Sequence, residues 1–410
     1  MFDFRNGTMK NNSQVTFVAG PVLFMLLIGL CACSSQNRCS VVSTCENLAA
    51  LKAGDAVILD GKKVVVKQMD ILPVVRNDYS RRFVFDSYEN PKLQKLRRQE
   101  QLDKVTAAGK TEFDRQVLLL DWVYHRFKKF GAPTSQASGA LDIVNDIDAG
   151  HTFFCNHYAR VMVGTAAALG WLDRLIAVRV GNNAHGSGVT EHSITEIWSN
   201  QYGKWIMFDP TFALYVEKNG IPLGAWEIRQ NWFYGDPDSL DFVIGAQRKK
   251  YKGKDMPIFM ANHPGFGDLT LTPRTIDKLA FLGYIPNTDL MDRGPDYAKM
   301  FITKDSLCDG IRWHLRDNPQ DPAREPYFPL NQAALTLTPA HGLKIDVGID
   351  TFTPNFAAYR YRIDQQNWRQ GKPDQWLLHP GKNSLQVVSV NKFGIEGSPA
   401  RAVLVLEKSR

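Results

Sequence analysis

Apolar residues recur at helical spacing through the first half of the chain. Between Pro91 and Phe130, they return every three to four positions, as on one buried helix face. Thr111 and Asp114 have the spacing of a capping box, which predicts that a helix begins there. A Gly- and Ser-containing loop, 131–139, then leads into a short helix expected over 140–147.

The next helical pattern begins at Cys155, and Gly170 supplies its C-terminal stop. A thiol at a helix N-terminus lies at the positive end of the macrodipole, which favours the nucleophilic thiolate. Cys155 is therefore a candidate nucleophile. The alternative is a buried cysteine that starts a core helix, since free cysteine is among the most buried residue types.

Two β-prone runs follow, 192–198 and 204–209, and the polar stretch between them predicts a hairpin. With the turn centred between Asn200 and Gln201, His192 lies opposite Asp209, at a Cβ separation of about 5 Å. The carboxylate would fix the imidazole tautomer, and the other ring nitrogen could face a thiol. Cys155, His192 and Asp209 thus have the logic of a nucleophilic site.

The strings F-C-N-H-Y-A-R-V-M-V-G-T-A-A-A-L-G, H-S-I-T-E-I-W and K-W-I-M-F-D-P-T resemble the three motifs of the transglutaminase-like superfamily, in the same order. The resemblance implies a papain-like core, in which the nucleophile helix packs on an antiparallel sheet. It implies Cys155 as nucleophile, His192 as base and acid, and Asp209 as orienting carboxylate. Trp198 and Trp205 resemble the aromatic positions that accompany the motif, and are candidate substrate contacts.

The glycine-rich stretch 181–190, after a strand expected over 174–180, predicts a mobile loop beside this site, with His185 as a further candidate substrate contact. No side chain could be chosen to complete an oxyanion hole with the Cys155 backbone N–H. His151, Cys155 and His157 do not have the spacing of a zinc site, so no metal or other cofactor is expected.

Beyond Thr211 the chain changes character. Aromatic residues between Phe212 and Val243 suit either ordinary core or a platform for sugars or peptides. A helix is expected from Thr272-Pro273 up to Gly283, and another over 300–315 with Cys308 on a packed face. Residues 318–331 are a proline-rich linker. Six alternating strands after Ala333 predict an antiparallel sandwich, which resembles an immunoglobulin or fibronectin type III module.

The N-terminus predicts export. Residues 15–30 carry no charge and are followed by L-C-A-C-S-S, which resembles a bacterial lipobox with Cys33 as the lipidated residue. A single uncleaved membrane anchor is the alternative. Cys39 and Cys45, in a Ser-rich tether, could pair in an oxidising compartment or stay free.

The net charge of +7 is spread in short clusters, which fits either a solvated surface or attraction to an anionic envelope polymer. No nucleic-acid motif accompanies it, so nucleic acid is not an expected partner.

Together these patterns predict an α+β protein, with a transglutaminase-like core followed by an all-β sandwich. The expected parts are a signal peptide (1–33), a tether with a short β-hairpin (34–75), the core (76–245), a helical or irregular extension with the linker (246–330), and the sandwich (331–410).

The expected function is that of a cell-envelope cysteine enzyme, held to the membrane by a lipid anchor. Its substrates would be amide bonds in a peptide, a glycopeptide or an envelope polymer, with hydrolysis favoured over cross-linking. The alternative is a catalytically silent lipoprotein scaffold that binds glycan or protein.

Overall fold

The computed structural model describes residues 50–70, 72–77, 79–181, 191–263, 267–303, 305–308 and 326–407. Four predicted features lie outside these residues: the signal peptide with Cys33, the tether with Cys39 and Cys45, the loop with His185, and most of the linker. Residues 47–410 form one compact unit. Among the described residues, no helix is both long enough and apolar enough to cross a membrane.

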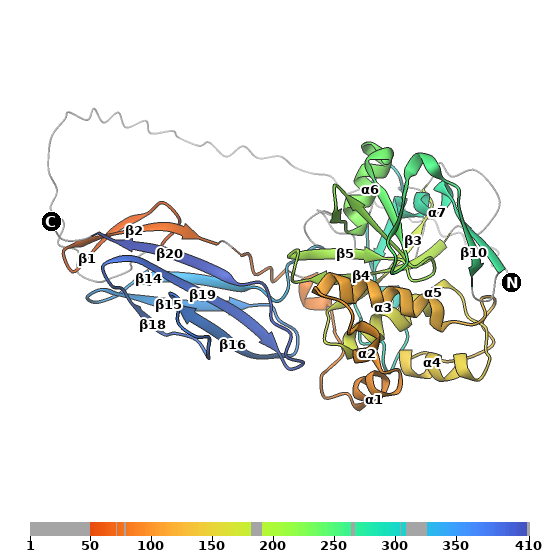
Figure 1. Cartoon of the computed structure of the whole chain (residues 1–410), viewed down its shortest axis with the longest axis horizontal. Coiled ribbons are helices and arrows are strands. Elements are labelled where there is room, and N and C mark those ends of the chain that lie inside the picture. The colour runs from red at the N-terminus through yellow and green to blue at the C-terminus, as the bar shows by residue number, and fades with distance from the viewer. Residues whose placement is uncertain are drawn as a thin grey trace, which may run out of the picture. The chain divides into compact units, whose positions relative to one another are not determined.

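Five helices form the first half of the core, as the helical spacing predicts (Figure 1). They are α1 (Pro91–Gln99), α2 (Leu102–Thr106), α3 (Glu112–Arg126), α4 (Ala140–Asp148) and α5 (Cys155–Ala168). The capping box at the start of α3 is confirmed. The Thr111 side chain accepts a hydrogen bond from the Asp114 backbone N–H, and the Asp114 carboxylate accepts one from the Thr111 N–H.

Helix α5 is buried on almost every side, so Cys155 lies at the end of a helix that is held firmly by its neighbours. One face packs with α1, α3 and α4, and the other lies on the central sheet. A Cβ at Gly164 would come within 2.3 Å of the Ala140 Cβ, so glycine is required for the close approach of α4. Gly170 ends the helix region with a φ of +85°, a conformation that favours glycine.

The central sheet has five strands in the order β13-β12-β3-β4-β5, and all the neighbours are antiparallel. The strands are β3 (Asp173–Arg179), β4 (Glu191–Ser199), β5 (Lys204–Phe208), β12 (Phe281–Tyr284) and β13 (Phe301–Ile302). Strands β12 and β13, at one side of this sheet, come from the segment 246–330, which was expected to be an extension. The sheet of the core therefore includes strands from well beyond residue 245.

The β4–β5 hairpin forms as predicted, but its register differs by two residues. Ser199 pairs with Lys204, so the turn is centred between Gln201 and Tyr202 rather than one position earlier. The predicted direct pairing of His192 with Asp209 is therefore wrong, because Asp209 lies just beyond the end of β5. A shift of two residues keeps every side chain on its expected face, whereas a shift of one would not.

A second sheet and a separate hairpin follow the Asp209 region. The sheet has the order β7-β6-β8-β9, from β6 (Leu214–Lys218), β7 (Ile221–Pro222), β8 (Asp241–Ile244) and β9 (Lys249–Lys252). Helix α6 (Ala225–Tyr234) lies between β7 and β8 in the chain, and β10 (Ile258–His263) pairs with β11 (Gly267–Leu271). Most of the aromatic side chains of this region pack against core, although Tyr234 is exposed.

Two helices expected in this part of the chain are corrected by the structure. The helix expected from Thr272-Pro273 up to Gly283 begins at Pro273, as predicted, but is limited to α7 (Pro273–Asp277) and a 3₁₀ turn, because Phe281 begins strand β12. The helix expected over 300–315 is wrong for its described residues, because Phe301–Ile302 is strand β13. Apolar runs this short cannot be assigned to helix or strand by periodicity alone. Cys308 is buried, as expected.

The C-terminal region is an all-β module of two facing sheets, so the predicted fold class is confirmed. One sheet has the order β14-β15-β18, and the other β1-β2-β20-β19-β16-β17. Their strands are β14 (Ala333–Pro339), β15 (Lys344–Thr351), β16 (Phe356–Ile363), β17 (Arg369–Gln370), β18 (Gln375–Leu377), β19 (Gly381–Asn391), β20 (Ala400–Leu406), β1 (Ala56–Leu59) and β2 (Lys62–Met69).

The N-terminal hairpin β1–β2 belongs to this module rather than standing ahead of the core. Strand β2 pairs with β20, and its inward residues Val64 and Val66 are buried in the sandwich interior. The hairpin therefore covers an edge that β20 would otherwise expose, and exposed edges invite pairing with other chains. The sandwich is thus built from both ends of the described chain.

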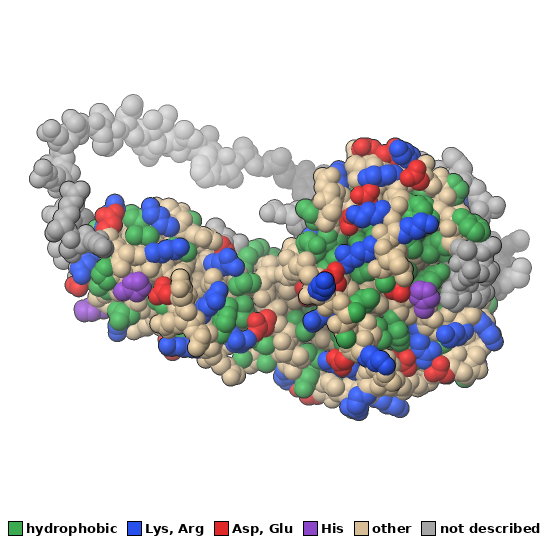
Figure 2. Space-filling view, viewed as in Figure 1, with side chains coloured by type: hydrophobic (Ala, Val, Ile, Leu, Met, Phe, Trp, Pro, Cys, Tyr) green, Lys and Arg blue, Asp and Glu red, His purple; other side chains and the backbone are tan. Residues whose placement is uncertain are grey.

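Charged side chains are mixed over the surface rather than gathered in one tract. On the face shown in Figure 2, Lys and Arg are interspersed with Asp and Glu. Even the basic run at 248–250 is largely paired, because Arg248 contacts Asp114 and Lys250 contacts Glu217. This arrangement favours the solvated-surface interpretation of the net charge.

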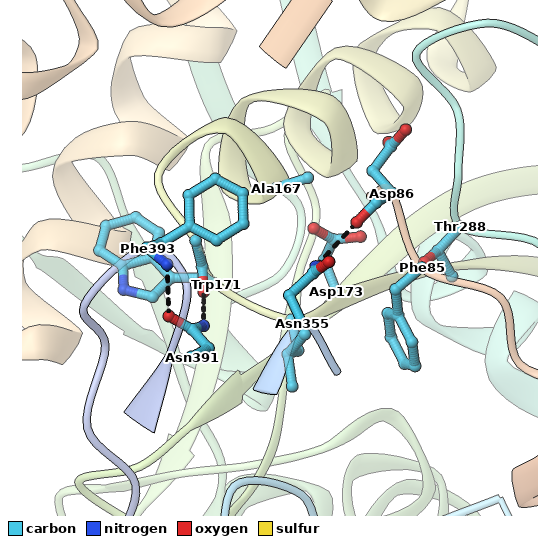
Figure 3. A pocket seen from close by; sticks show the side chains of 11 residues that line it. Phe85, Asp86, Ala167, Trp171, Asp173, Thr288, Asn355, Asn391 and Phe393 are labelled. Atoms are coloured by element: carbon cyan, nitrogen blue, oxygen red, sulfur yellow. Dashed lines mark hydrogen bonds between the residues drawn. The ribbon is translucent and has the colours of Figure 1, made fainter. Parts of the chain in front are cut away.

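Two asparagine side chains of the sandwich reach the core (Figure 3). Nδ2 of Asn391 donates to the backbone oxygen of Gly170 at 3.0 Å, and Nδ2 of Asn355 donates to that of Asp86 at 2.9 Å. A Cβ at Gly170 would lie 2.4 Å from the Cβ of Phe393. Glycine at this position therefore permits both the helix end and the close approach of the sandwich loop.

Two carboxyl groups, Asp86 and Asp173, line a small cavity at the same junction (Figure 3). Asp86 is 5 % exposed and Asp173 is 2 % exposed. Burial, and after it the charges of Asp289 and Asp292, raises the pKa of Asp86 to about 7. Burial and the nearby Asp86 also raise the pKa of Asp173. The junction is therefore most stable when these groups carry protons.

We predict that Asp86→Asn weakens the pH dependence of stability. Folded Asp86 keeps a proton that the unfolded chain releases above about pH 4, so the free energy of unfolding should fall between about pH 4 and pH 7. The fall is at most roughly 4 kcal/mol for this one group. Asparagine cannot ionise, so the free energy of unfolding of the variant, measured by urea denaturation, should fall less between about pH 4 and pH 7 than that of the wild type. Asp374→Asn, which changes an exposed carboxyl, is the control. Identical curves for Asp86→Asn and the wild type would contradict the prediction.

Candidate active site

Cys155 is the first residue of α5 and is half-buried. The N-cap residue, Phe154, provides no side-chain hydrogen bond, and the first backbone N–H groups of a helix have no intrahelical acceptor. The thiol thus lies beside unpaired N–H groups at the positive end of the macrodipole, where negative charge is stabilised.

His192 and Asp209 form a buried pair despite the shifted register. Nε2 of His192 lies 2.7 Å from Oδ2 of Asp209, and the two residues are 7 % and 3 % exposed. The other carboxylate oxygen accepts a hydrogen bond from the Thr211 N–H at 3.0 Å. The Phe212 ring packs edge-on against the imidazole. Asp209 is therefore fixed by its own backbone turn and in turn fixes the orientation of the imidazole.

The imidazole joins this pair to the thiol. Because Nε2 contacts Asp209, Nδ1 is the nitrogen left for the hydrogen bond between His192 and Cys155. The Ser193 backbone also donates to the sulfur. The structure thus brings together all three side chains that the sequence motifs selected. The sequence had placed His192 and Asp209 side by side through a cross-strand pair, whereas the contact is made beyond the end of the paired strands.

These contacts change the acidity of both groups. Burial opposes ionisation of the thiol, but the His192 charge and the hydrogen bonds from His192 and Ser193 outweigh it, so the pKa of Cys155 is lowered. Burial also opposes the imidazolium. The negative charges of Asp209 and Cys155 outweigh that effect and raise the pKa of His192 to about 10. The arrangement favours a thiolate–imidazolium pair over the neutral pair.

A second set of polar groups surrounds the thiol. Nδ2 of Asn156, the residue after Cys155, donates to the Ser193 Oγ at 3.3 Å and to the Tyr297 hydroxyl. Sequence reasoning missed these three residues. Asn156 directly follows Cys155 and Ser193 directly follows His192, and this position in the motifs is the sequence signal that marks them as neighbours of the site. Tyr297 is far along the chain and has no motif around it.

Cys155 and His192 line a cavity of about 480 Å³. Its walls are mostly apolar, and at one side lies the ion pair of Arg179 with Glu191, with an N–O distance of 3.8 Å. The remaining lining residues are Phe154, Asn156, Ala177, Val178, Ser193, Phe281 and Tyr297. Such a cavity has room for a short uncharged segment of a substrate beside the thiol.

The tryptophans expected to contact substrate lie elsewhere. Trp198 and Trp205 are 2 % and 1 % exposed, pack edge-on against each other, and do not line this cavity. The Trp205 Nε1 donates to the Phe328 backbone oxygen at 3.1 Å. Both are core residues that join the sheet to the segment before the sandwich. This position does not fit direct contact with a substrate. His185 lies outside the described residues.

Among the described residues, no group of three or more His, Cys, Asp or Glu side chains is arranged to hold a metal ion. His151 contacts the Thr134 hydroxyl. His157 is buried against Phe153, and burial together with the Arg160 charge lowers its pKa to about 4.

Comparisons with known proteins agree with this geometry. Residues 99–210 match the family model described as the transglutaminase-like superfamily. No curated protein sequence gives a match. Eleven chains of solved structures match, among them a protein from Cytophaga hutchinsonii that is provisionally assigned as a cysteine protease. That match has 18 % identity and a TM-score of 0.25, and covers 36 % of this chain and 48 % of that one, so it carries no argument here. Residues 99–210 therefore match the transglutaminase-like superfamily and contain the helix-on-sheet core observed here.

Proposed function

We propose that this protein is an exported, lipid-anchored cysteine enzyme that acts on amide bonds of peptides or glycopeptides. The observation that carries the proposal is the chain of contacts from Asp209 to His192 and from His192 to Cys155, with the thiol and the imidazole lining one cavity. A buried thiol with no chemical role would gain nothing from a charged imidazole and a carboxylate, because burying charges is costly unless they are paired.

The reaction begins when the Cys155 thiolate attacks the carbonyl carbon of the bound amide. The C–S bond forms as the carbonyl π electrons move onto oxygen, which gives a tetrahedral oxyanion. As the oxyanion collapses, the C–N bond breaks and the His192 imidazolium gives its proton to the leaving amine. Asp209 holds the ring in orientation throughout and stabilises its charged form.

The resulting thioester is then resolved by water. His192, now neutral, removes a proton from the water molecule as its oxygen attacks the thioester carbonyl, and the Cys155 thiolate leaves. We favour water over an amine as acceptor, since nothing in the sequence marks a second binding site for an amine. The apolar walls formed by Ala177, Val178 and Phe281 suit an uncharged acyl segment.

The expected location is the bacterial cell envelope. The proposal rests here on the sequence alone, on the apolar stretch 15–30 and on Cys33 in L-C-A-C-S-S. The partners would be a membrane, through the lipid on Cys33, and a peptide, glycopeptide or envelope polymer as substrate. No nucleic acid is expected to bind.

We predict that Cys155 reacts rapidly with iodoacetamide at about pH 6, well below the ordinary range of a free thiol. The lowered pKa of Cys155 keeps the thiolate populated as the pH falls, and the raised pKa of His192 keeps its imidazolium partner up to about pH 10. Removing the imidazole in His192→Ala should move labelling to above about pH 8. Mass spectrometry distinguishes Cys155 from the buried Cys308. Labelling only above pH 8 in both proteins would favour the silent scaffold.

We also predict how turnover of p-nitrophenyl acetate depends on the three residues. Cys155→Ala should abolish it, because the variant lacks the thiolate that forms the acyl intermediate. Asp209→Asn should reduce it at least about tenfold, since the ring loses its charged partner. Cys308→Ala, which removes the other described free thiol, should retain full turnover. Undiminished release of p-nitrophenolate by Cys155→Ala would end the proposal.

A further inference from the structure

The proposed reaction needs two hydrogen-bond donors for its oxyanion, and only one is evident from the helix. The Cys155 backbone N–H is in the first turn of α5, where N–H groups have no intrahelical acceptor, and it belongs to the same residue as the sulfur. A second donor must line the same cavity, carry a free hydrogen and be held rigidly. Tyr297 meets these conditions.

Hydrogen bonding around Tyr297 uses its oxygen and leaves its proton free. One hydrogen of the Asn156 amide is donated to the Ser193 Oγ and the other to the Tyr297 hydroxyl oxygen. The Ser193 hydroxyl also bonds to Tyr297, and because this bond lowers the pKa of the phenol, Ser193 is the donor and the phenolic oxygen the acceptor. Tyr297 therefore accepts two hydrogen bonds from these partners.

The remaining hydrogen of the phenol is available to the cavity that Tyr297 lines together with Cys155 and His192. Burial raises the pKa of Tyr297 to about 12, so the hydroxyl keeps its proton up to and beyond about pH 10, where the His192 imidazolium is lost. The nearby guanidinium of Arg160 acts in the opposite direction and makes the hydroxyl a stronger donor.

The position of Tyr297 is fixed by its own segment. The residue lies between β12 and β13, two strands of the sheet that carries His192. The Asn287 side chain accepts from the Asp296 N–H at 2.6 Å and donates to the Gly294 backbone oxygen at 3.2 Å, which holds the loop closed. A donor must be held within a fraction of an ångström to act without reorganisation.

The other nearby donors are less suitable. Both hydrogens of the Asn156 amide are already used. The Lys278 ammonium interacts electrostatically with Cys155 and Asp209, but it is not among the described residues that line the cavity.

We propose that the Tyr297 hydroxyl, with the Cys155 backbone N–H, forms the oxyanion hole of this enzyme. The inference rests on the proposed acyl-transfer function. When the thiolate attacks the carbonyl, the oxygen gains negative charge and accepts a hydrogen bond from Tyr297, which keeps its proton. When the leaving group departs, the carbonyl reforms and the hydrogen bond weakens. Tyr297 thus stabilises the transition state more than the bound substrate.

The test compares two reactions of the same thiolate in the full chain in detergent. Acylation by p-nitrophenyl acetate passes through a tetrahedral oxyanion, whereas alkylation by iodoacetamide does not. We expect Tyr297→Phe to slow single-turnover acylation of Cys155 by roughly 100-fold or more. The alkylation rate at about pH 6 should stay within about twofold, which also shows that the thiolate–imidazolium pair remains folded.

Tyr284→Phe is the matched control, because it removes a buried tyrosine hydroxyl from β12 that contacts Tyr327 and does not line the cavity. Both of its rates should equal those of the wild type. Equal acylation rates in Tyr297→Phe and the wild type would overturn the inference. A parallel loss of acylation and alkylation in Tyr297→Phe would also overturn it, since Tyr297 would then act only by positioning the thiol.

A second variant covers the case in which Tyr297→Phe does not fold. Asn156→Ala keeps the tyrosine hydroxyl but removes the amide that orients it, so acylation should slow at least about tenfold relative to alkylation. An unchanged ratio would overturn the inference. If wild-type Cys155 is alkylated but never acylated, the proposed acyl-transfer function itself fails, and that result is separate from any effect of these variants.

Discussion

The buried hydrogen bond between Asp209 and His192 is the contact on which the arrangement of the site depends. A charged imidazole at this depth would be destabilising without its carboxylate, and the carboxylate would be destabilising without the ring. The pairing requires Asp209 to lie just past the end of β5, His192 to lie at the start of β4, and α5 to begin at Cys155. Three separate elements therefore have to be positioned together before the thiolate is stabilised.

The rigidity of α5 and the breadth of its sheet serve that requirement. The helix is enclosed by α1, α3 and α4 on one side and by β3 and β4 on the other, so its N-terminus has little freedom. The outer strands β12 and β13 extend the sheet and bring the segment with Tyr297 against Asn156 and Ser193. A part of the chain expected to be peripheral thus completes the wall of the cavity.

The sandwich is joined to the domain by polar contacts as well as by apolar ones, such as that of Phe393 with the core. Asn391 and Asn355 bond to backbone oxygens of the core, and the carboxyls Asp86 and Asp173 lie at the same place. Carboxyl groups with raised pKa values make this junction sensitive to pH between about 4 and 7, whereas the raised pKa of His192 keeps its imidazolium charged up to about pH 10. A change of pH between about 4 and 7 should therefore alter the stability of the junction but not the charge of His192.

Local patterns in the sequence determined the helices of the core, the β4–β5 hairpin and the strands of the sandwich. They also determined the choice of Cys155, His192 and Asp209. These features could be predicted because periodicity, capping residues and short motifs act over a few neighbouring positions. Only the tertiary structure decided the two-residue register, the joining of β1 and β2 to the sandwich, the burial of Trp198 and Trp205, and the place of Tyr297. Each of these features depends on contacts between residues far apart in the chain, and the energy of such contacts cannot be predicted from a few neighbouring residues.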